Sequence, residues 1–371
     1  MAAGGRTVAV WDIGIRLFHW GLLAAVAASA WTGFVAGRVA LAWHLIGGVA
    51  VAGLLLWRLA WGVLGSRYAR FASFAYGPRQ VLGHVRDLLR RSSPRHLGHN
   101  PLGAAMVFAL LAVLAALALT GTLTLGGLLK QGPLRAFLPY ALGVSARSLH
   151  NALAIMLLAM VGLHLCGVSF ESWRGRENLT AAMLTGDKRA DLAVDAKRRP
   201  AAGRPLLANG LAMLLLLLGA GCVAALAALP GRGVPPVVQD PVYAEQCGAC
   251  HLAYPPSLAP AATWDGILGD LQHHFGQDAT LSPEQVATIR AWVDANDAAH
   301  WDTLASHVLR VPAADGSRRL TDTPGWRRLH RRIADAVFAS KAVGGRSSCE
   351  ACHGDAATGL FAPQRIAVPR Q

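Results

Sequence analysis

Long apolar stretches dominate the first part of the chain. Five of them occur before residue 230, and each is long enough to cross about 30 Å of hydrocarbon as a helix. We expect membrane-spanning helices over residues 17–36, 39–64, 101–129, 149–170 and 206–229. Beyond them, apolar and polar residues mix as in a water-soluble domain. The pattern predicts an all-α protein with a membrane bundle and a separate C-terminal domain.

Three segments follow from this division. Residues 1–200 are predicted to form a four-helix membrane domain, 201–240 a fifth anchoring helix with a linker rich in Pro, Gly and Val, and 241–371 a helical C-terminal domain. In the last segment we expect one helix over residues 263–276 and others beginning after Ser282 and Thr323, where capping residues and proline coincide. No alternating strand pattern is evident there.

The positive charge lies entirely in the membrane half. Residues 1–229 contain 22 Lys+Arg against 7 Asp+Glu, whereas the remainder contains 13 against 14. The basic residues gather in two alternate loops, within residues 67–95 and 174–204, and such loops face the cytoplasm. We therefore expect a bacterial inner-membrane protein with a cytoplasmic N-terminus and a periplasmic C-terminal domain. A nucleic-acid partner is not needed to explain the charge.

The pattern Cys-x-x-Cys-His occurs twice in the C-terminal domain. Its residues are Cys247, Cys250 and His251, and again Cys349, Cys352 and His353. Two thiols at this spacing bind haem vinyl groups as thioethers, and the adjacent histidine binds the iron. A zinc site or a disulfide is the alternative, but 98 residues separate Cys250 from Cys349, far beyond zinc-ribbon spacing. The motifs predict two covalent c-type haems.

A second iron ligand must come from histidine in this domain, because the last methionine of the chain is Met213, in the fifth span. The candidates are His273, His274, His300, His307 and His330. We choose His274 and His330 because each continues an apolar stripe of its predicted helix. The alternative is a hydrogen-bonded core histidine, and which histidine serves which haem stays open.

Polar residues within membrane spans are functional by default. The spans contain four histidines, His19, His44, His150 and His164. The last two share one helix, and their separation of 14 residues corresponds to roughly 21 Å of rise on nearly the same face. His19 and His164 are therefore expected at one depth in the membrane, and His44 and His150 at another. We call these the two level pairs. Such facing pairs predict two b-type haems, although a lone histidine can also serve only as a hydrogen-bonding residue.

Arg58 is the one charge well inside a span. It follows His44 by 14 residues on the same helical face. It could bind a propionate of the inner haem, or it could reach the membrane interface through its long side chain.

Residues 8–186 resemble the bacterial cytochrome b561 family, which includes the cytochrome b subunits of nickel-iron hydrogenases. The resemblance is carried by Val10-Trp11-Asp12, Arg16, His19-Trp20, His44, Arg58, Trp61-Gly62, Gly98-His99-Asn100-Pro101-Leu102-Gly103, His150 and His164. It implies a four-helix core with two haems b that exchanges electrons with quinones. Residues 241–371 are similar to the soluble dihaem cytochrome c family, through both attachment motifs, residues 273–276 and residues 321–330.

These expectations combine into an electron relay in the lipid membrane, between the quinone pool and a periplasmic cytochrome or other soluble redox protein. Two alternatives stay open: a periplasmic haem reductase in which one c haem lacks a second ligand, and a membrane anchor for a hydrogenase or dehydrogenase. Whether the protein acts as a quinol:cytochrome c oxidoreductase, and its oligomeric state, also stay open.

Overall fold

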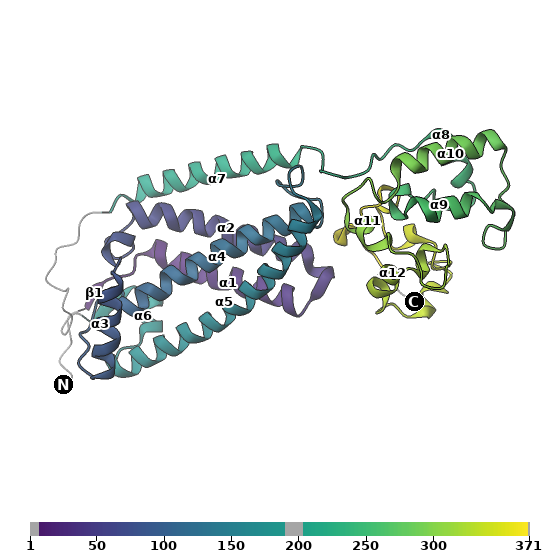
Figure 1. The fold of residues 1–371 in the computed structure, drawn as a ribbon. Coiled ribbons are helices and arrows are strands. Elements are labelled where there is room, and N and C mark those ends of the chain that lie inside the picture. Colours follow the sequence, from purple (N-terminus) through teal and green to yellow (C-terminus); the bar gives the residue numbers. More distant parts are fainter. Residues whose placement is uncertain (1–6, 190–202, 370–371) are drawn as a thin grey trace. The chain divides into compact units, whose positions relative to one another are not determined.

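Five long helices form the membrane part of the computed structural model, which describes residues 7–189 and 203–369 (Figure 1). They are α1 (Ile13–Phe34), α2 (Leu41–Leu64), α4 (Pro101–Gly127), α5 (Tyr140–Gly175) and α7 (Pro205–Ala227). Each is long and apolar enough to span a membrane, so the predicted five spans are confirmed. The main difference is α5, which has 36 residues and begins at Tyr140 rather than at the predicted residue 149. Basic residues 197–199 and the domain boundary predicted at residue 200 lie outside the described residues.

The outer surfaces of these helices are apolar. On α7, for example, Leu206 is 86% exposed and Leu217 is 63% exposed. A water-soluble protein rarely exposes a continuous apolar face of this size, whereas lipid covers it at no cost. The exposure pattern supports a membrane protein.

The contacts divide the chain into two units. The first comprises residues 1–121 and 147–223, and the second comprises residues 122–146 and 224–371. Each unit has its own buried clusters. The boundaries predicted at residues 200 and 240 stay predictions.

The first unit has a four-helix core. Helices α1, α2, α4 and α5 meet around Val51, Leu114 and Leu157. Helix α7 packs on α2 through small residues, with Ala208 fully buried. Across this contact, Trp57 Nε1 donates to Asn209 Oδ1 at 3.3 Å. Small residues at the contact allow two helices to approach closely in lipid, where apolar burial alone does not hold helices together.

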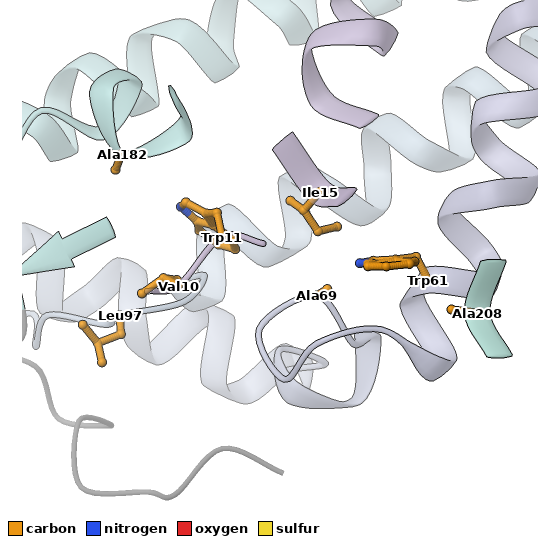
Figure 2. Close-up of a cluster of buried hydrophobic side chains, with 8 residues drawn as sticks. All are labelled: Val10, Trp11, Ile15, Trp61, Ala69, Leu97, Ala182 and Ala208. Atoms are coloured by element: carbon orange, nitrogen blue, oxygen red, sulfur yellow. The ribbon is translucent and has the colours of Figure 1, made fainter. Parts of the chain in front are cut away.

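A second cluster closes one end of the bundle. Figure 2 shows its eight buried residues, Val10, Trp11, Ile15, Trp61, Ala69, Leu97, Ala182 and Ala208. Within it, Asp12 caps α1 by accepting from Ile15 N at 2.9 Å and also accepts from Trp61 Nε1 at 3.2 Å. The cluster joins segments from the beginning, middle and end of the unit.

This end of the bundle also has elements that the sequence pattern did not predict. Strand β1 (Thr7–Ala9) pairs antiparallel with β2 (Asp187–Arg189), placing Thr7 opposite Arg189. Two shorter helices, α3 (Pro78–Leu89) and α6 (Leu179–Thr185), lie in the loops after α2 and α5, and the 3-10 turn η2 (Phe71–Ser73) also follows α2. A further 3-10 turn, η1 (Gly37–Ala40), connects α1 to α2 at the other end of the bundle. Three-residue strands are too short to produce an alternating pattern.

The second unit contains short helices separated by turns. The helices are α8 (Pro241–Cys247), α9 (Ala261–Leu268), α10 (Pro283–Asn296), α11 (Leu304–Leu309), α12 (Pro324–His330) and α13 (Asp335–Phe338). The 3-10 turns are η3 (Pro256–Leu258), η4 (Leu271–His273), η5 (Leu320–Asp322), η6 (Cys349–Ala351), η7 (Ala356–Thr358) and η8 (Pro363–Arg365). They enclose two apolar clusters, one around Tyr243 and Ile289 and the other around Leu258 and Trp326.

Two of the three predicted helix starts in this unit are confirmed. Ser282 forms a capping box at the start of α10, and Thr323 caps α12. The helix predicted over residues 263–276 is wrong at both ends, since α9 runs from Ala261 to Leu268. The chain leaves the helical conformation at Asp270, whose φ is −144° and ψ is 54°. Positive φ angles at Phe275 (52°) and Gly276 (96°) also exclude a right-handed helix at the predicted C-terminal end.

Residues 122–146 belong to the second unit through a buried ion pair. The Lys130 side chain is 1% exposed, and its Nζ donates to Asp302 Oδ2 at 2.9 Å. The same carboxylate oxygen accepts from Tyr140 N at 2.8 Å. His307 stacks on the Tyr140 ring at 4.1 Å between centroids. These contacts join the segment after α4 to the region around α11.

Candidate metal centres

Three histidine pairs share one ring spacing. The ring centroids are 6.1 Å apart for His44 and His150, 6.2 Å for His251 and His274, and 6.1 Å for His330 and His353. Two imidazoles on opposite sides of one metal ion are expected to lie about 6 Å apart, since each metal–nitrogen bond measures about 2 Å and each centroid lies about 1 Å behind its nitrogen. The three pairs therefore fit a bis-histidine iron.

The His44–His150 pair joins α2 to α5, and its rings are fixed by hydrogen bonds. His44 Nδ1 lies 3.1 Å from Ser29 O, and His150 Nδ1 lies 3.1 Å from Leu117 O. A carbonyl only accepts, so the proton must be on Nδ1. Nε2 of each ring is then left with the lone pair that a metal requires.

The second membrane pair, His19 and His164, comes from α1 and α5. The two side chains are close enough to interact electrostatically. His19 Nδ1 is buried, and in the described part of the chain no hydrogen-bond partner reaches it. The structure thus brings both level pairs together, but the hydrogen-bonding environments differ.

Arg58 lies inside the first unit and is 3% exposed. Its guanidinium stacks over the Phe71 ring at 4.4 Å, and Asp12 is near enough to attract it. One terminal nitrogen is buried with no hydrogen-bond partner within residues 7–189 and 203–369. An arginine that reached the membrane interface would be exposed, so the burial favours the alternative in which Arg58 faces an anionic group.

His99 is a residue that pattern reasoning missed. Its ring packs between Trp11 and Phe74, at 4.9 and 4.4 Å between centroids. Burial, together with the positive charges of Arg58 and Lys188, lowers the pKa of His99 to about 3. The sequence signal that could have identified it is the Gly98–Gly103 motif, which is part of the family resemblance. Within this motif, Asn100 caps α4 by accepting a hydrogen bond from Gly103 N at 2.7 Å. Like the terminal nitrogen of Arg58, His99 Nδ1 is buried and has no hydrogen-bond partner among the described residues.

The first Cys-x-x-Cys-His motif begins at the last residue of α8. His251 Nδ1 lies 2.7 Å from Leu252 O, which again leaves Nε2 free. His274, which faces it, lies in the turn after η4. Burial lowers the pKa of His274, and nearby His251 lowers it further, so both factors favour a neutral imidazole. Burial raises the pKa of the Cys247 thiol to about 11.

The second motif lies at η6, and its partner histidine comes from α12. His330 Nδ1 lies 2.9 Å from Trp326 O, and the two rings stack at 4.3 Å. Burial, together with the negative charge of Glu350, raises the pKa of the Cys349 thiol to about 11. In the structure all six cysteines are free thiols. Within the described ranges, no group of three or more His, Cys, Asp or Glu side chains is arranged for a metal ion.

The remaining candidate histidines are bound by carboxylates instead. His273 pairs with Asp270 at 2.9 Å, His300 with Asp297 at 2.7 Å, and His307 with Asp302 at 2.8 Å. His274 and His330, chosen from the sequence, are the two that face motif histidines.

Comparisons with known proteins assign both parts of the chain. Residues 10–186 match the family model described as prokaryotic cytochrome b561, and residues 243–361 match the model described as dihaem cytochrome c. The dihaem cytochrome c from Rhodobacter sphaeroides is 35% identical, over 34% of this chain and 100% of that chain, with a TM-score of 0.30. The dihaem cytochrome type c from Shewanella baltica OS155 is 28% identical, over 36% and 95%, with a TM-score of 0.29. A search of curated proteins found no match.

Apolar spanning helices with facing histidines, joined to two Cys-x-x-Cys-His motifs, define the class of membrane-anchored multihaem cytochromes. Within it, the chain belongs to the prokaryotic cytochrome b561 family in its membrane domain, which is fused to a C-terminal domain of the dihaem cytochrome c family. The first family binds haem b and the second binds two haems c. The resemblance inferred from the sequence is therefore confirmed.

Proposed function

We propose that this protein relays electrons between membrane quinol and a soluble redox partner in the periplasm. Two haems b and two covalent haems c would supply the one-electron redox chemistry. The proposal goes beyond the family assignment, which supports membrane electron transfer in general.

One observation carries the proposal: facing histidines occur in both units, and three pairs have the ring spacing of 6.1–6.2 Å that one iron requires. A chain that only anchored a partner enzyme would need no such pairs outside the membrane.

Each residue group has a proposed role. His44 with His150, and His19 with His164, would hold the two haems b. His251 with His274, and His353 with His330, would hold the two haems c.

The other residues would attach or position the cofactors. Cys247, Cys250, Cys349 and Cys352 would form the thioether bonds. Arg58 would bind a haem propionate, because its buried guanidinium has a terminal nitrogen without a partner in the described chain. His99 lies near Arg58 and His164 and would provide a second hydrogen bond to the same anionic group.

The orientation follows from charge. The basic loops after the second and the fourth span favour a cytoplasmic N-terminus, and an odd number of spans then directs the C-terminal domain to the periplasm. Covalent haem attachment of this kind takes place in the periplasm, which agrees with this topology. A periplasm-dependent reporter fused after residue 371 should be active, whereas the same reporter fused after residue 70 should be inactive.

The function is tested on the purified full-length protein. A pyridine haemochrome spectrum should give two haems b and two haems c per chain, and a b-to-c ratio clearly different from one would refute the count. Rapid mixing with a quinol analogue should reduce both the b and the c absorbance bands, and an oxidised soluble cytochrome should then reoxidise them. If quinol reduced neither band while a soluble dehydrogenase partner did, the anchor alternative would replace the relay.

A further inference from the structure

The two ligand candidates of the His44–His150 pair have the same surroundings. His44 Nδ1 lies 3.1 Å from Ser29 O and 3.3 Å from Thr32 Oγ1. His150 Nδ1 lies 3.1 Å from Leu117 O and also 3.1 Å from Thr120 Oγ1. In both cases the carbonyl belongs to the residue three positions before the threonine. One ring is thus held by α1 and the other by α4, in the same way.

The threonine hydroxyls act as acceptors for these rings. Thr32 Oγ1 lies 2.8 Å from Ala28 O, and Thr120 Oγ1 lies 2.7 Å from Ala116 O. Each hydroxyl therefore donates its one proton to the preceding turn of its own helix and offers a lone pair to the histidine. Both neighbours of each Nδ1 accept, so Nδ1 carries the proton and Nε2 does not.

A glycine follows each threonine and permits the close approach. A Cβ added at Gly33 would lie 3.3 Å from His44 Cε1, and one added at Gly121 would lie 3.3 Å from His150 Cε1. Any larger residue would push the His44 ring away from α1, or the His150 ring away from α4. We call Thr32–Gly33 and Thr120–Gly121 the two Thr–Gly pairs.

The other membrane pair does not share this arrangement. His19 Nδ1 is buried without a hydrogen-bond partner in the part of the chain that the structure describes. The Thr–Gly pairs therefore distinguish one proposed haem site from the other within the same bundle.

We propose that the two Thr–Gly pairs are positioning residues that fix the tautomer and orientation of both axial ligands of one haem b, and so lower the reduction potential of that haem. A histidine whose Nδ1–H is hydrogen-bonded donates more electron density through Nε2, which stabilises ferric over ferrous iron. The inference rests on the proposed function, in which His44 and His150 bind haem.

The test replaces each threonine by valine, which removes the hydroxyl and keeps the shape of the side chain. Thr32→Val, Thr120→Val and the double variant are purified as full-length protein, and the midpoint potentials of both b components are measured potentiometrically. We expect the potential of one b component to rise in each single variant and to rise further in the double variant. The other b component and both c components should not change.

Four further variants make the result specific. Thr32→Ser and Thr120→Ser keep a hydroxyl and should restore the original potential, which a purely steric role would not require. Thr124→Val makes the same substitution one turn further along α4 and should leave all potentials unchanged. Gly121→Ala should alter the ferric low-spin electron paramagnetic resonance signal of the same b component, because the added Cβ displaces the His150 ring.

Unchanged potentials of both b components in the double valine variant would overturn the inference. Failure of the underlying function is distinguished by His44→Ala. If that variant kept both haems b, the ligand assignment itself would be wrong. If it lost one haem b while the double valine variant retained the original potentials, only the role of the Thr–Gly pairs would be wrong.

Discussion

The two halves of this protein hold their histidine pairs in different ways. In the bundle, all four histidines lie on helices of 22 residues or more, and helical register alone determines which of them face each other. In the C-terminal domain, the motif histidines lie outside the helices, and of their partners one lies in a turn and the other ends a seven-residue helix. A regular helix fixes the separation of two histidines that are far apart in sequence. The positions of histidines outside helices depend instead on how the surrounding segments fold.

The difference extends to the proposed attachment of the haems. A haem in the bundle would depend on its axial ligands and packing alone, whereas the C-terminal motifs add two thioether bonds each. Loss of a histidine should therefore have different consequences in the two halves, and the following predictions test this.

The largest effect is expected in the bundle. His44→Ala should reduce the b content from two haems to one per chain, since no covalent bond would retain the cofactor. His150→Ala should remove the same component, and His19→Ala or His164→Ala should remove the other. The measurement is a pyridine haemochrome count combined with low-temperature spectra of the b bands.

His96→Ala is the matched control, because this histidine lies in the loop before α4 and is assigned no iron; it should keep both haems b. If single changes at His44 and His164 abolished the same spectral component, the pairing by depth would be wrong.

A smaller effect is expected from the corresponding change in the C-terminal domain. His330→Ala should leave the c content at two haems, because Cys349 and Cys352 would still attach the cofactor. It should open one coordination position, so that the reduced protein binds carbon monoxide at one c haem. Difference spectra with and without carbon monoxide measure this.

His300→Ala removes a histidine that is paired with Asp297 at 2.7 Å, and this variant should bind no carbon monoxide at its c haems. A His330→Ala protein that stayed inert to carbon monoxide would show that another residue provides the second ligand.

The smallest effect concerns stability in the second unit. Asp302→Asn leaves Lys130 buried without its counter-charge, and we expect a loss of about 2 kcal/mol in unfolding free energy. This is less than for a fully buried pair, because the Asp302 side chain is 29% exposed. Thermal or guanidinium unfolding, followed by the c-haem absorbance, measures the loss. Glu245→Gln, which neutralises an exposed carboxylate, should change stability by less than about 0.5 kcal/mol.

The same pair predicts a pH dependence. Burial alone would raise the pKa of Asp302, but hydrogen bonds from Lys130, His307 and Tyr140 hold it below its ordinary value. A carboxyl group with a lowered pKa stabilises the fold at neutral pH and loses this contribution as pH falls through the folded-state pKa. The difference between the original protein and Asp302→Asn should therefore be constant near pH 7 and shrink in acid. A difference that grew in acid would contradict the ionised pair.

Several features of this protein follow from its sequence alone. The five spans are visible because lipid requires about 20 consecutive apolar residues, which is a local property. The attachment motifs are visible because two thioethers and an axial ligand require a fixed short spacing. The level pairing of the membrane histidines could be expected because a helix converts residue number into depth at a constant rate.

Other features were decided only by the tertiary structure. His273 and His274 are adjacent in sequence, yet the turn at Phe275 leaves one beside Asp270 and the other facing His251. Strands β1 and β2 join residues about 180 positions apart.

Long-range contacts explain why the sequence did not single out His99 and Thr120 as site residues. Arg58, His99 and His164 interact although they come from three different elements, and the hydroxyl of Thr120 meets His150 thirty residues later. A pattern within one helix reports which face is apolar, but it does not report which side chain from another helix lies opposite. That information exists only once the helices have packed and the buried polar groups have found partners.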